Sequence, residues 1–360
     1  MRRSRLRSLA APLSTAALSL SLALAAPSAA QAHAPGRSPA PARGHAPAAC
    51  SPYVGITGFS DQLDKTSVAG TPVSELSGFA HDTDGRLLAV GDSSYLYTLD
   101  PRTDDVLSAQ PLAHRDGTIL DSEAVAVNPD GTRLVTDETA PSVSLFSRSG
   151  RELGALPVPD ALKVAPAGRA THNLTFEGLA LLPGGRTLVA SMEGALTGDA
   201  PDLRRFQTWQ RIGRSDAFRL GPQYAFRTDP GLDVSDITST GDGRLLVLER
   251  TYTSGVGNTV HLVLADPRGA TDVAGVDVLT DGQRGVRPVA ARTIADIGAC
   301  PSLGATAKQP QPNPLLDNIE GVTVDGRGPA GTLRVLLVSD DNANPVQTTR
   351  LYRLTARLPR

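Results

Sequence analysis

The chain has 360 residues, with 35 Lys or Arg against 37 Asp or Glu, and its formal net charge is −2. A chain with this balance has no surplus of basic residues to neutralise phosphates, so a nucleic acid is not an expected partner. The length suits one large domain or two ordinary ones.

The amino terminus has the three parts of a secretory signal peptide. Met1–Arg7 is basic, Leu9–Ala26 consists almost wholly of Ala, Leu and Ser, and Ala30–Ala32 offers the small-x-small pattern of a cleavage site. A membrane anchor is the alternative, but serines interrupt the apolar run and Pro27 follows it. We therefore predict a signal peptide over residues 1–32, cleavage at its end, and secretion without further contact with the membrane.

Residues 33–49 contain four prolines and no large apolar side chain. Such a segment cannot bury enough surface to offset its ordering entropy, so we predict a disordered leader, followed by one folded domain over residues 50–360. Cys50 and Cys300 are the two cysteines, and both belong to this domain. In an oxidising compartment they are expected to form one disulfide, with two buried free thiols as the alternative.

Five segments of the domain repeat one pattern. Each has an acidic residue, alternating apolar positions, a Gly-containing turn, a second apolar run and further acids. Two such runs around a turn predict an antiparallel hairpin. The five segments are residues 75–92, 121–138, 175–194, 233–250 and 318–341.

The repeats predict an all-β fold, a β-propeller. Weaker strands follow most hairpins, and the first four repeats recur every 48 to 59 residues, which fits five recognisable four-stranded blades. The longer interval before the last repeat contains a strand-like Val289–Ile297. A propeller with a degenerate sixth blade is therefore an alternative to one with five blades. Tyr53–Phe59 is expected to complete the last blade and close the ring. A β-sandwich is the alternative fold.

The acids of each repeat are expected to meet at one end of the channel. The first strand of a blade lines the channel and the second runs antiparallel beside it, so the start of one lies next to the end of the other. The expected pairs are Glu75 with Asp92, Glu123 with Asp137 or Glu138, Glu177 with Glu193, Asp236 with Glu249, and Glu320 with Asp340 or Asp341.

Carboxylates crowded in this way must either take up protons or bind a cation. Oxygen ligands suit Ca²⁺ far better than Zn²⁺, which would require His or Cys. The alternative is that the acids cap turns, accept backbone amides and pair with arginines. The residues predicted to bind Ca²⁺ are Glu75, Asp92, Glu123, Glu177, Glu193, Asp236, Glu249, Glu320 and Asp340.

Three arginines lie beside these acids in the sequence, namely Arg115, Arg250 and Arg350. A guanidinium group binds phosphate oxygens in pairs, so we predict that these residues bind substrate, with salt bridges to neighbouring carboxylates as the alternative.

The sequence has no G-x-S-x-G, H-E-x-x-H, C-x-x-C or P-loop motif. A hydrolase of this kind would use a metal-activated water as its nucleophile. The candidate catalytic residues are Glu177, Glu320, Asp340 and Asp341.

Several short phrases resemble one known family. Residues 173–180 (NLTFEGLA), 248–252 (LERTY), 318–322 (NIEGV) and 337–342 (LVSDDN), with Leu76-Ser77-Gly78, are similar to the phytase-like family of exported bacterial propellers, often called "esterase-like activity of phytase". The resemblance covers about residues 53–357. It implies a propeller fold and a phosphoesterase or esterase activity.

We therefore expect a secreted hydrolase of phosphate esters or other small esters that uses Ca²⁺ and acts as a monomer on a small molecule. A non-catalytic propeller that binds an extracellular ligand, with structural Ca²⁺, is the first alternative. A metal-dependent lactonase is the second.

Overall fold

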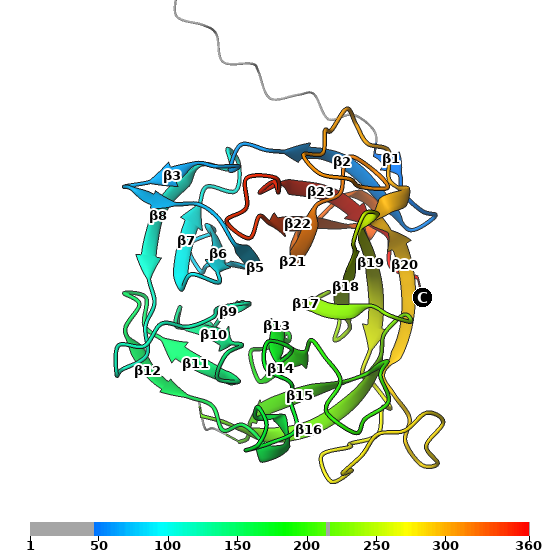
Figure 1. Ribbon diagram of the computed structural model, residues 1–360. Helices are drawn as coiled ribbons and strands as arrows, with labels where there is room; N and C mark the ends of the chain where they lie inside the picture. Colours follow the sequence, from blue (N-terminus) through cyan, green and yellow to red (C-terminus); the bar gives the residue numbers. More distant parts are fainter. Residues whose placement is uncertain (1–46, 214–216, 360) are drawn as a thin grey trace, which may run out of the picture. The chain divides into compact units, whose positions relative to one another are not determined.

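Five antiparallel sheets surround a central axis in the computed structural model, which describes residues 47–213 and 217–359 (Figure 1). The chain is therefore an all-β propeller of five blades, as its repeats predict. The proposed signal peptide, residues 1–32, and most of the proposed leader lie outside the described residues. The last leader residues do not: Ala48–Ala49 forms strand β1, so ordered structure begins before Cys50.

The first two repeats form the first two blades. In each blade the strands follow the chain order from the channel outward, so the first strand is innermost. These strands are β5 (Leu76–His81), β6 (Leu87–Gly91), β7 (Tyr95–Leu99), β8 (Val106–Pro111), β9 (Val125–Val127), β10 (Arg133–Asp137), β11 (Ser142–Phe146) and β12 (Glu152–Ala155).

The third and fourth blades have longer outer strands. Their strands are β13 (Phe176–Leu181), β14 (Thr187–Met192), β15 (Leu203–Arg211), β16 (Phe218–Arg227), β17 (Asp233–Ser239), β18 (Leu245–Thr253), β19 (Gly257–Asp266) and β20 (Ala290–Asp296).

No sixth blade forms among the described residues. The strand expected at Val289–Ile297 is β20, which pairs with β19 as the outer strand of the fourth blade. The insertion before it packs onto the third blade, where the amide of Val273 donates to the carbonyl of Gln223 at 2.8 Å. The long interval in the sequence is thus an insertion within one blade.

The fifth blade joins the two ends of the domain. Strand β2 (Val54–Ser60) pairs with β23 (Leu351–Ala356), and the innermost strands are β21 (Asn318–Arg327) and β22 (Leu333–Asp340). The ring is therefore closed by an amino-terminal strand, as predicted. A short hairpin, β3 (Ser67–Val68) and β4 (Thr71–Pro72), leads into the first blade.

Helical structure in the described part of the chain is limited to three 3₁₀ turns, none of which could span a bilayer. They are η1 (Asp160–Leu162), η2 (Ile297–Ala299) and η3 (Pro329–Gly331).

The core lies between neighbouring blades, because each sheet buries both faces. Leu88 of the first blade and Val135 of the second belong to one cluster, and Leu248 of the fourth blade and Leu337 of the fifth belong to another. All four side chains are almost fully buried. This explains the runs of aliphatic residues in the second strand of every repeat.

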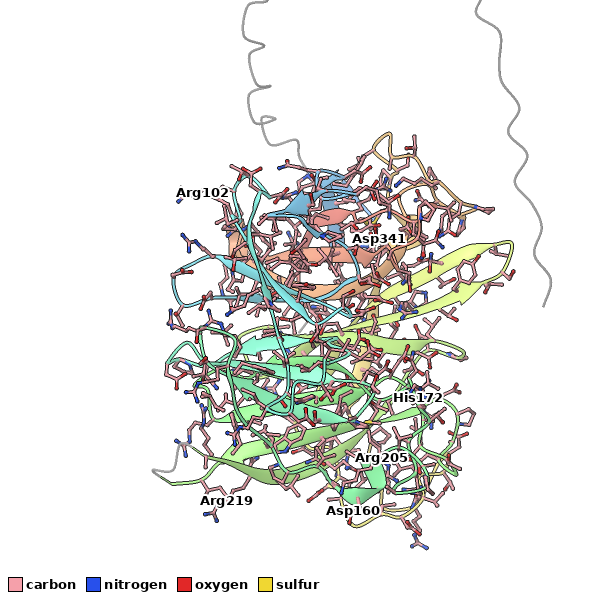
Figure 2. All side chains as sticks on the ribbon, turned by 60° about the vertical axis from the view of Figure 1, so that its left-hand side comes forward. Arg102, Asp160, His172, Arg205, Arg219 and Asp341 are labelled. Atoms are coloured by element: carbon pink, nitrogen blue, oxygen red, sulfur yellow. A yellow bond between two sulfur atoms is a disulfide. The ribbon has the colours of Figure 1, made fainter. Side chains whose placement is uncertain are left out.

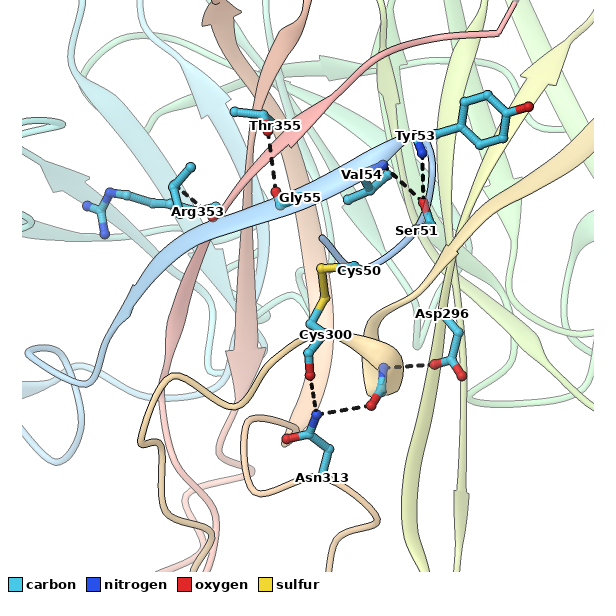
Figure 3. The surroundings of a disulfide bond; sticks show 12 residues. Cys50, Ser51, Tyr53, Val54, Gly55, Asp296, Cys300, Asn313, Arg353 and Thr355 are labelled. Carbon is cyan, nitrogen blue, oxygen red and sulfur yellow. Dashed lines mark hydrogen bonds between the residues drawn. A yellow bond between two sulfur atoms is a disulfide. The ribbon is translucent and has the colours of Figure 1, made fainter. Parts of the chain in front are cut away.

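The predicted disulfide is present between Cys50 and Cys300, and the described residues contain no free cysteine (Figure 3). It joins the segment between β1 and β2 to the end of η2, 250 residues away. Nearby, the hydroxyl of Ser51 donates to the carbonyl of Ile294 at 2.6 Å, and Asn313 Nδ2 donates to the carbonyl of Cys300 at 2.7 Å. The disulfide thus fastens the closing strand to the fourth blade.

Replacing Cys50, Cys300 or both by Ser should lower the free energy of unfolding by about 2–5 kcal/mol, because the open chain gains entropy when the cross-link is lost. Urea denaturation of the three variants measures this loss. Both single variants and the double variant should be destabilised equally, since each breaks the same bond. A double variant as stable as the wild-type protein would show that β2 holds the ring without the disulfide.

Candidate active site at the channel mouth

A β-bulge interrupts the innermost strand of four blades just after the strand begins. At each bulge one residue has no partner in the ladder of the neighbouring strand. These residues are Ser77 in β5, Glu177 in β13, Ser235 in β17 and Glu320 in β21. Bulges of this kind re-aim a side chain next to a functional site. With Glu123, which stands at the same place before β9, these five residues form the bulge ring.

A second set of residues lies at the end of the neighbouring strand of each blade. Asp340 pairs with Asn318, and Arg250 pairs with Asp233. In the other three blades a backbone hydrogen bond marks the same place, for example from the amide of Glu193 to the carbonyl of Thr175 at 2.7 Å. Asp92, Glu138, Glu193, Arg250 and Asp340 therefore form the second ring.

The two rings crowd carboxylates at one channel mouth. Oxygens of Glu123, Glu138 and Glu177 all lie within 4.8 Å of one another, and so do oxygens of Asp92, Asp121 and Glu123. Glu123 belongs to both groups and is 6% exposed. The expectation that acids of different repeats meet at one place is therefore met by the geometry.

Arg250 supplies the cation in these rings. Its Nη2 lies 2.5 Å from Oε1 of Glu320 and 3.7 Å from Oε1 of Glu193. Burial alone would lower the pKa of Arg250, but Glu320 and the other carboxylates hold it above its ordinary value. The side of the mouth formed by the last three blades is thus partly neutralised.

The opposite side has no such partner, and its carboxyl groups favour the protonated form. Burial, followed by the charge of Glu123, raises the pKa of Glu177 well above its ordinary value. Burial raises the pKa of Glu138 to about 7. On the side of Arg250, burial raises the pKa of Glu193 to about 8 despite that cation. Near neutral pH these groups can hold protons, and a cation would replace the protons.

The residues on this side fit a hard divalent cation. No Lys or Arg among the described residues forms a salt bridge with Glu123, Glu138 or Glu177. Oε2 of Glu177 is buried and has no hydrogen-bond partner in the described part of the chain. An all-oxygen donor set with an unpaired buried oxygen suits Ca²⁺, which prefers six to eight oxygen ligands.

The predicted pair of the fourth repeat does not join the rings. Asp236 follows the bulge by one residue, and Oδ1 and Oδ2 accept the amides of Ile237 at 2.7 Å and Val322 at 2.8 Å. Glu249 precedes Arg250 and therefore points to the other face of its strand. A one-residue difference in register therefore keeps both acids out of the two rings.

Two further acids lie at the rim of the mouth. Asp341 forms a salt bridge with Lys65, and its Oδ1 accepts the amide of Glu75 at 3.0 Å. Glu75 accepts a hydrogen bond from the hydroxyl of Ser93. Asp341, which directly follows β22, is labelled in Figure 2 beside the strands of the fifth blade. Its carboxylate is thus already engaged by a lysine and a backbone amide.

Asp340 belongs to the second ring, and its two oxygens are also hydrogen-bonded. Oδ1 accepts the amide of Asn342 at 2.6 Å, and Oδ2 accepts Nδ2 of Asn318 at 3.2 Å. In the second blade Glu138 takes the ring position, and the alternative, Asp137, lies 2.9 Å from Nε2 of His114.

Two of the three predicted substrate-binding arginines are engaged elsewhere. Arg350 is 1% exposed, and its five N–H groups donate to the carboxylate of Asp61 and to three backbone carbonyls. Arg115 lies beside the outer strand of the second blade, where its amide donates to Glu152 at 2.8 Å and its guanidinium to the carbonyl of Leu153. Arg250 is the one that the fold places at the mouth.

Sequence comparison of the repeats missed two members of the site. Asp121 stands two residues before the bulge ring, in the position that Glu75 occupies in the first blade, and contributes to a carboxylate group. Ser77 takes the bulge position of the first blade and donates to Oδ1 of Asp92 at 2.5 Å. Aligning the repeats on Gly78, Gly178 and Gly321 rather than on the nearest acid would have found both.

A cavity of about 450 Å³ adjoins the neutralised side of the mouth. It is lined by Arg250 and Glu320 together with amide side chains, among them Asn318 and Asn342. A small polar molecule can therefore reach Arg250 from solvent.

The chain is similar to several known proteins. Over 130 residues the chain is 31% identical to a protein of Arthroderma benhamiae named "Uncharacterized secreted protein"; the match covers 29% of this chain and a quarter (25%) of that protein's length. Two solved structures, a putative gluconolactonase and the gluconolactonase XC5397 from Xanthomonas campestris, are 16% and 15% identical, with TM-scores of 0.42 and 0.43. The likeness covers 80% of this chain and 78% of the first structure, and 79% of this chain and 73% of the second.

At these TM-scores the likenesses carry no conclusion about activity. Residues 71–343, by contrast, match a family described as "Phytase-like: Esterase-like activity of phytase". This match takes in the inner strands of all five blades and both rings of the mouth. The chain therefore belongs to the phytase-like family.

Proposed function

We propose that this protein is an exported hydrolase of phosphate esters or other small esters, and that it works at the channel mouth with bound Ca²⁺. The observation that supports this most directly is the group formed by Glu123, Glu138 and Glu177, whose oxygens lie within 4.8 Å of one another. Among the described residues, no Lys or Arg forms a salt bridge with any of the three. Membership of the phytase-like family supports the ester-hydrolysing chemistry.

The residues around Glu123 would hold the cation. Asp92 and Asp121 approach it from the first blade and from the connection into the second, and Glu138 lies on its other side. When bound, Ca²⁺ supplies a Lewis acid that polarises the ester and lowers the pKa of a water. Carboxylate oxygens are the kind of ligand that this ion prefers.

Glu177 is assigned the role of general base. It lies beside the proposed ligands, and its Oε2 has no hydrogen-bond partner among the described residues. Burial raises the affinity of this carboxylate for a proton, as accepting one from water requires. The other acids favoured by the sequence are less free, because Glu320 pairs with Arg250 and Asp340 is hydrogen-bonded through both oxygens.

Arg250 is assigned the binding of an anionic ester oxygen. It lines the cavity, and Glu320 and Glu193 fix the direction of its guanidinium group. A planar guanidinium group held in this way binds phosphate or a developing oxyanion well. The proposed substrate is a small molecule that enters the cavity beside Arg250. The proposed hydrolase acts as a single copy of the chain.

Export is part of the proposal. The disulfide between Cys50 and Cys300 fits an oxidising compartment, and the Arthroderma benhamiae relative is named as secreted. Both observations agree with the signal peptide predicted over residues 1–32.

Ca²⁺ should stabilise the protein more at about pH 8 than at about pH 5. Burial raises the pKa of Glu138, a proposed ligand, to about 7, so between its ordinary value and pH 7 the folded state holds a proton that the unfolded chain releases. The stability of the Ca²⁺-free protein therefore falls as the pH rises through this window. Ca²⁺ binds the deprotonated groups, and at a hundred times its dissociation constant it adds about 2.7 kcal/mol.

Thermal unfolding of EDTA-treated protein, with and without added Ca²⁺, measures this effect at each pH. Mg²⁺ at the same concentration controls for ionic strength. Equal shifts of the melting temperature at both pH values would contradict binding by these carboxylates.

Glu177→Gln should lower kcat for a reactive phosphate or carboxylate ester roughly 100-fold or more, because the amide cannot take up the proton. Stabilisation by Ca²⁺ should largely persist, since Glu123 and its other neighbours remain. The matched control is Glu152→Gln, on the outer strand of the second blade, which should keep wild-type activity. Hydrolysis by wild-type protein that survives EDTA would refute the mechanism. Stabilisation by Ca²⁺ without turnover of any ester would instead identify a ligand-binding propeller.

A further inference from the structure

A second cluster of metal-ligating side chains lies on the face of the fourth blade that packs against the third blade. Glu249 on β18 and His261 on β19 occupy directly opposed positions of the ladder, so their side chains share one face. Asp229, in the connection between β16 and β17, reaches the same place. One ligand atom from each of the three residues lies within 4.8 Å of the others.

The hydrogen bonds within this cluster leave two polar atoms unused. Oδ2 of Asp229 accepts Nδ1 of His261 at 2.6 Å and the hydroxyl of Thr293 at 2.9 Å. Oε2 of Glu249 accepts the amide of Asp229 at 2.9 Å. Among the described residues, Oε1 of Glu249 and Nε2 of His261 make no hydrogen bond.

Glu249 is the notable member, because it is 1% exposed and still has an unpartnered oxygen. It lines a cavity of about 470 Å³ together with Asp229 and Thr293. The carboxylate of Glu249 lines this cavity, so a ligand that enters the cavity can bind its free oxygen.

The neighbouring arginines do not supply that partner. The guanidinium groups nearest the cluster are each bound to another group, namely Arg204 to Asp233 at 2.7 Å, Arg227 to Asp281 at 2.5 Å, and Arg292 to the hydroxyl of Tyr53 at 2.6 Å. None of these three guanidinium groups forms a salt bridge with Asp229 or Glu249 among the described residues.

We propose that Asp229, Glu249 and His261 bind one divalent transition-metal ion of the Zn²⁺ class, at a site separate from the carboxylates of the channel mouth. A histidine nitrogen with two carboxylates is the mixed donor set that Zn²⁺ accepts and Ca²⁺ does not favour. Three protein ligands beside an open cavity leave a coordination position for water or another small ligand, which is the arrangement of reactive rather than structural zinc sites.

His114 also lies between two carboxylates, but neither of its ring nitrogens is free to bind a metal. Both of its ring nitrogens are bound by carboxylates on opposite sides, Nε2 by Asp137 at 2.9 Å and Nδ1 by Glu152 at 3.3 Å. No nitrogen of His114 is left for a metal. It is therefore a matched control for His261.

The test uses the full exported chain, stripped with a chelator and supplied with excess Ca²⁺ to saturate the channel mouth. Titration with Zn²⁺ followed by calorimetry should show one site, and Co²⁺ in place of Zn²⁺ should give the visible absorption of a low-coordinate nitrogen and oxygen site. His261→Asn should weaken Zn²⁺ binding by more than the roughly 10–100-fold that loss of an outer partner costs. His114→Asn should leave it unchanged.

Glu249→Gln provides a second variant, which keeps the shape of the side chain and removes its charge. It should also weaken Zn²⁺ binding, while the Ca²⁺-dependent stabilisation is retained. The proposal is overturned if the wild-type chain binds no Zn²⁺ once Ca²⁺ is present. It is equally overturned if binding survives both His261→Asn and Glu249→Gln, or falls as much in His114→Asn. Unfolding curves of each variant verify that the protein tested is folded.

Discussion

Closure of the ring is the constraint on which the other features of this protein depend. Five sheets can surround an axis only if the last one joins the first part of the chain, and here β2 supplies the strand that pairs with β23. The disulfide of Cys50 holds that strand against the fourth blade. Once the ring is closed, the innermost strands surround the channel. The residues at the starts of these strands are therefore brought together at one end of it.

Glycines allow the inner strands to approach so closely. A Cβ atom added to Gly78 would lie 2.5 Å from the carbonyl oxygen of Glu123, and one added to Gly178 would lie 2.5 Å from the amide nitrogen of Ile237. Neighbouring blades therefore touch backbone to backbone just beside the bulge ring. This explains why carboxylates from different repeats come within 4.8 Å of one another. The close packing of the backbone and the electrostatic crowding of the mouth have the same origin.

Contacts between two strands of the same repeat could be predicted from the sequence. Hairpin register is local, so the approach of Glu123 to Glu138, or of Glu320 to Asp340, follows from the alternation of apolar residues and the position of the turn. The bulge is less visible in the sequence, because it shifts the register by one residue where Ser235 and Asp236 are both polar. The prediction therefore assigned Asp236 to the ring of acids, although Ser235 occupies the bulge position.

Contacts between blades and with loops could not be predicted from a repeat. Arg350 is held by Asp61 and by backbone carbonyls that come from outside its own repeat. Asp229 lies in a connection between blades, so its approach to Glu249 is a consequence of tertiary structure alone. For the same reason a single strand, β18, presents Arg250 to the channel and Glu249 to a separate cavity.

Arg250 also ends the equivalence of the five blades. Four blades place an acid in the second ring, and the fourth blade alone places a cation there. The mouth is consequently asymmetric: Arg250 partly neutralises the carboxylates next to the fourth blade, and no salt bridge among the described residues does so for Glu123 and Glu138 of the second blade. A ligand that carries charge at one end only therefore meets different surroundings in its two orientations. The substitution of one residue in one repeat thus converts a nearly five-fold symmetric opening into one with a preferred direction.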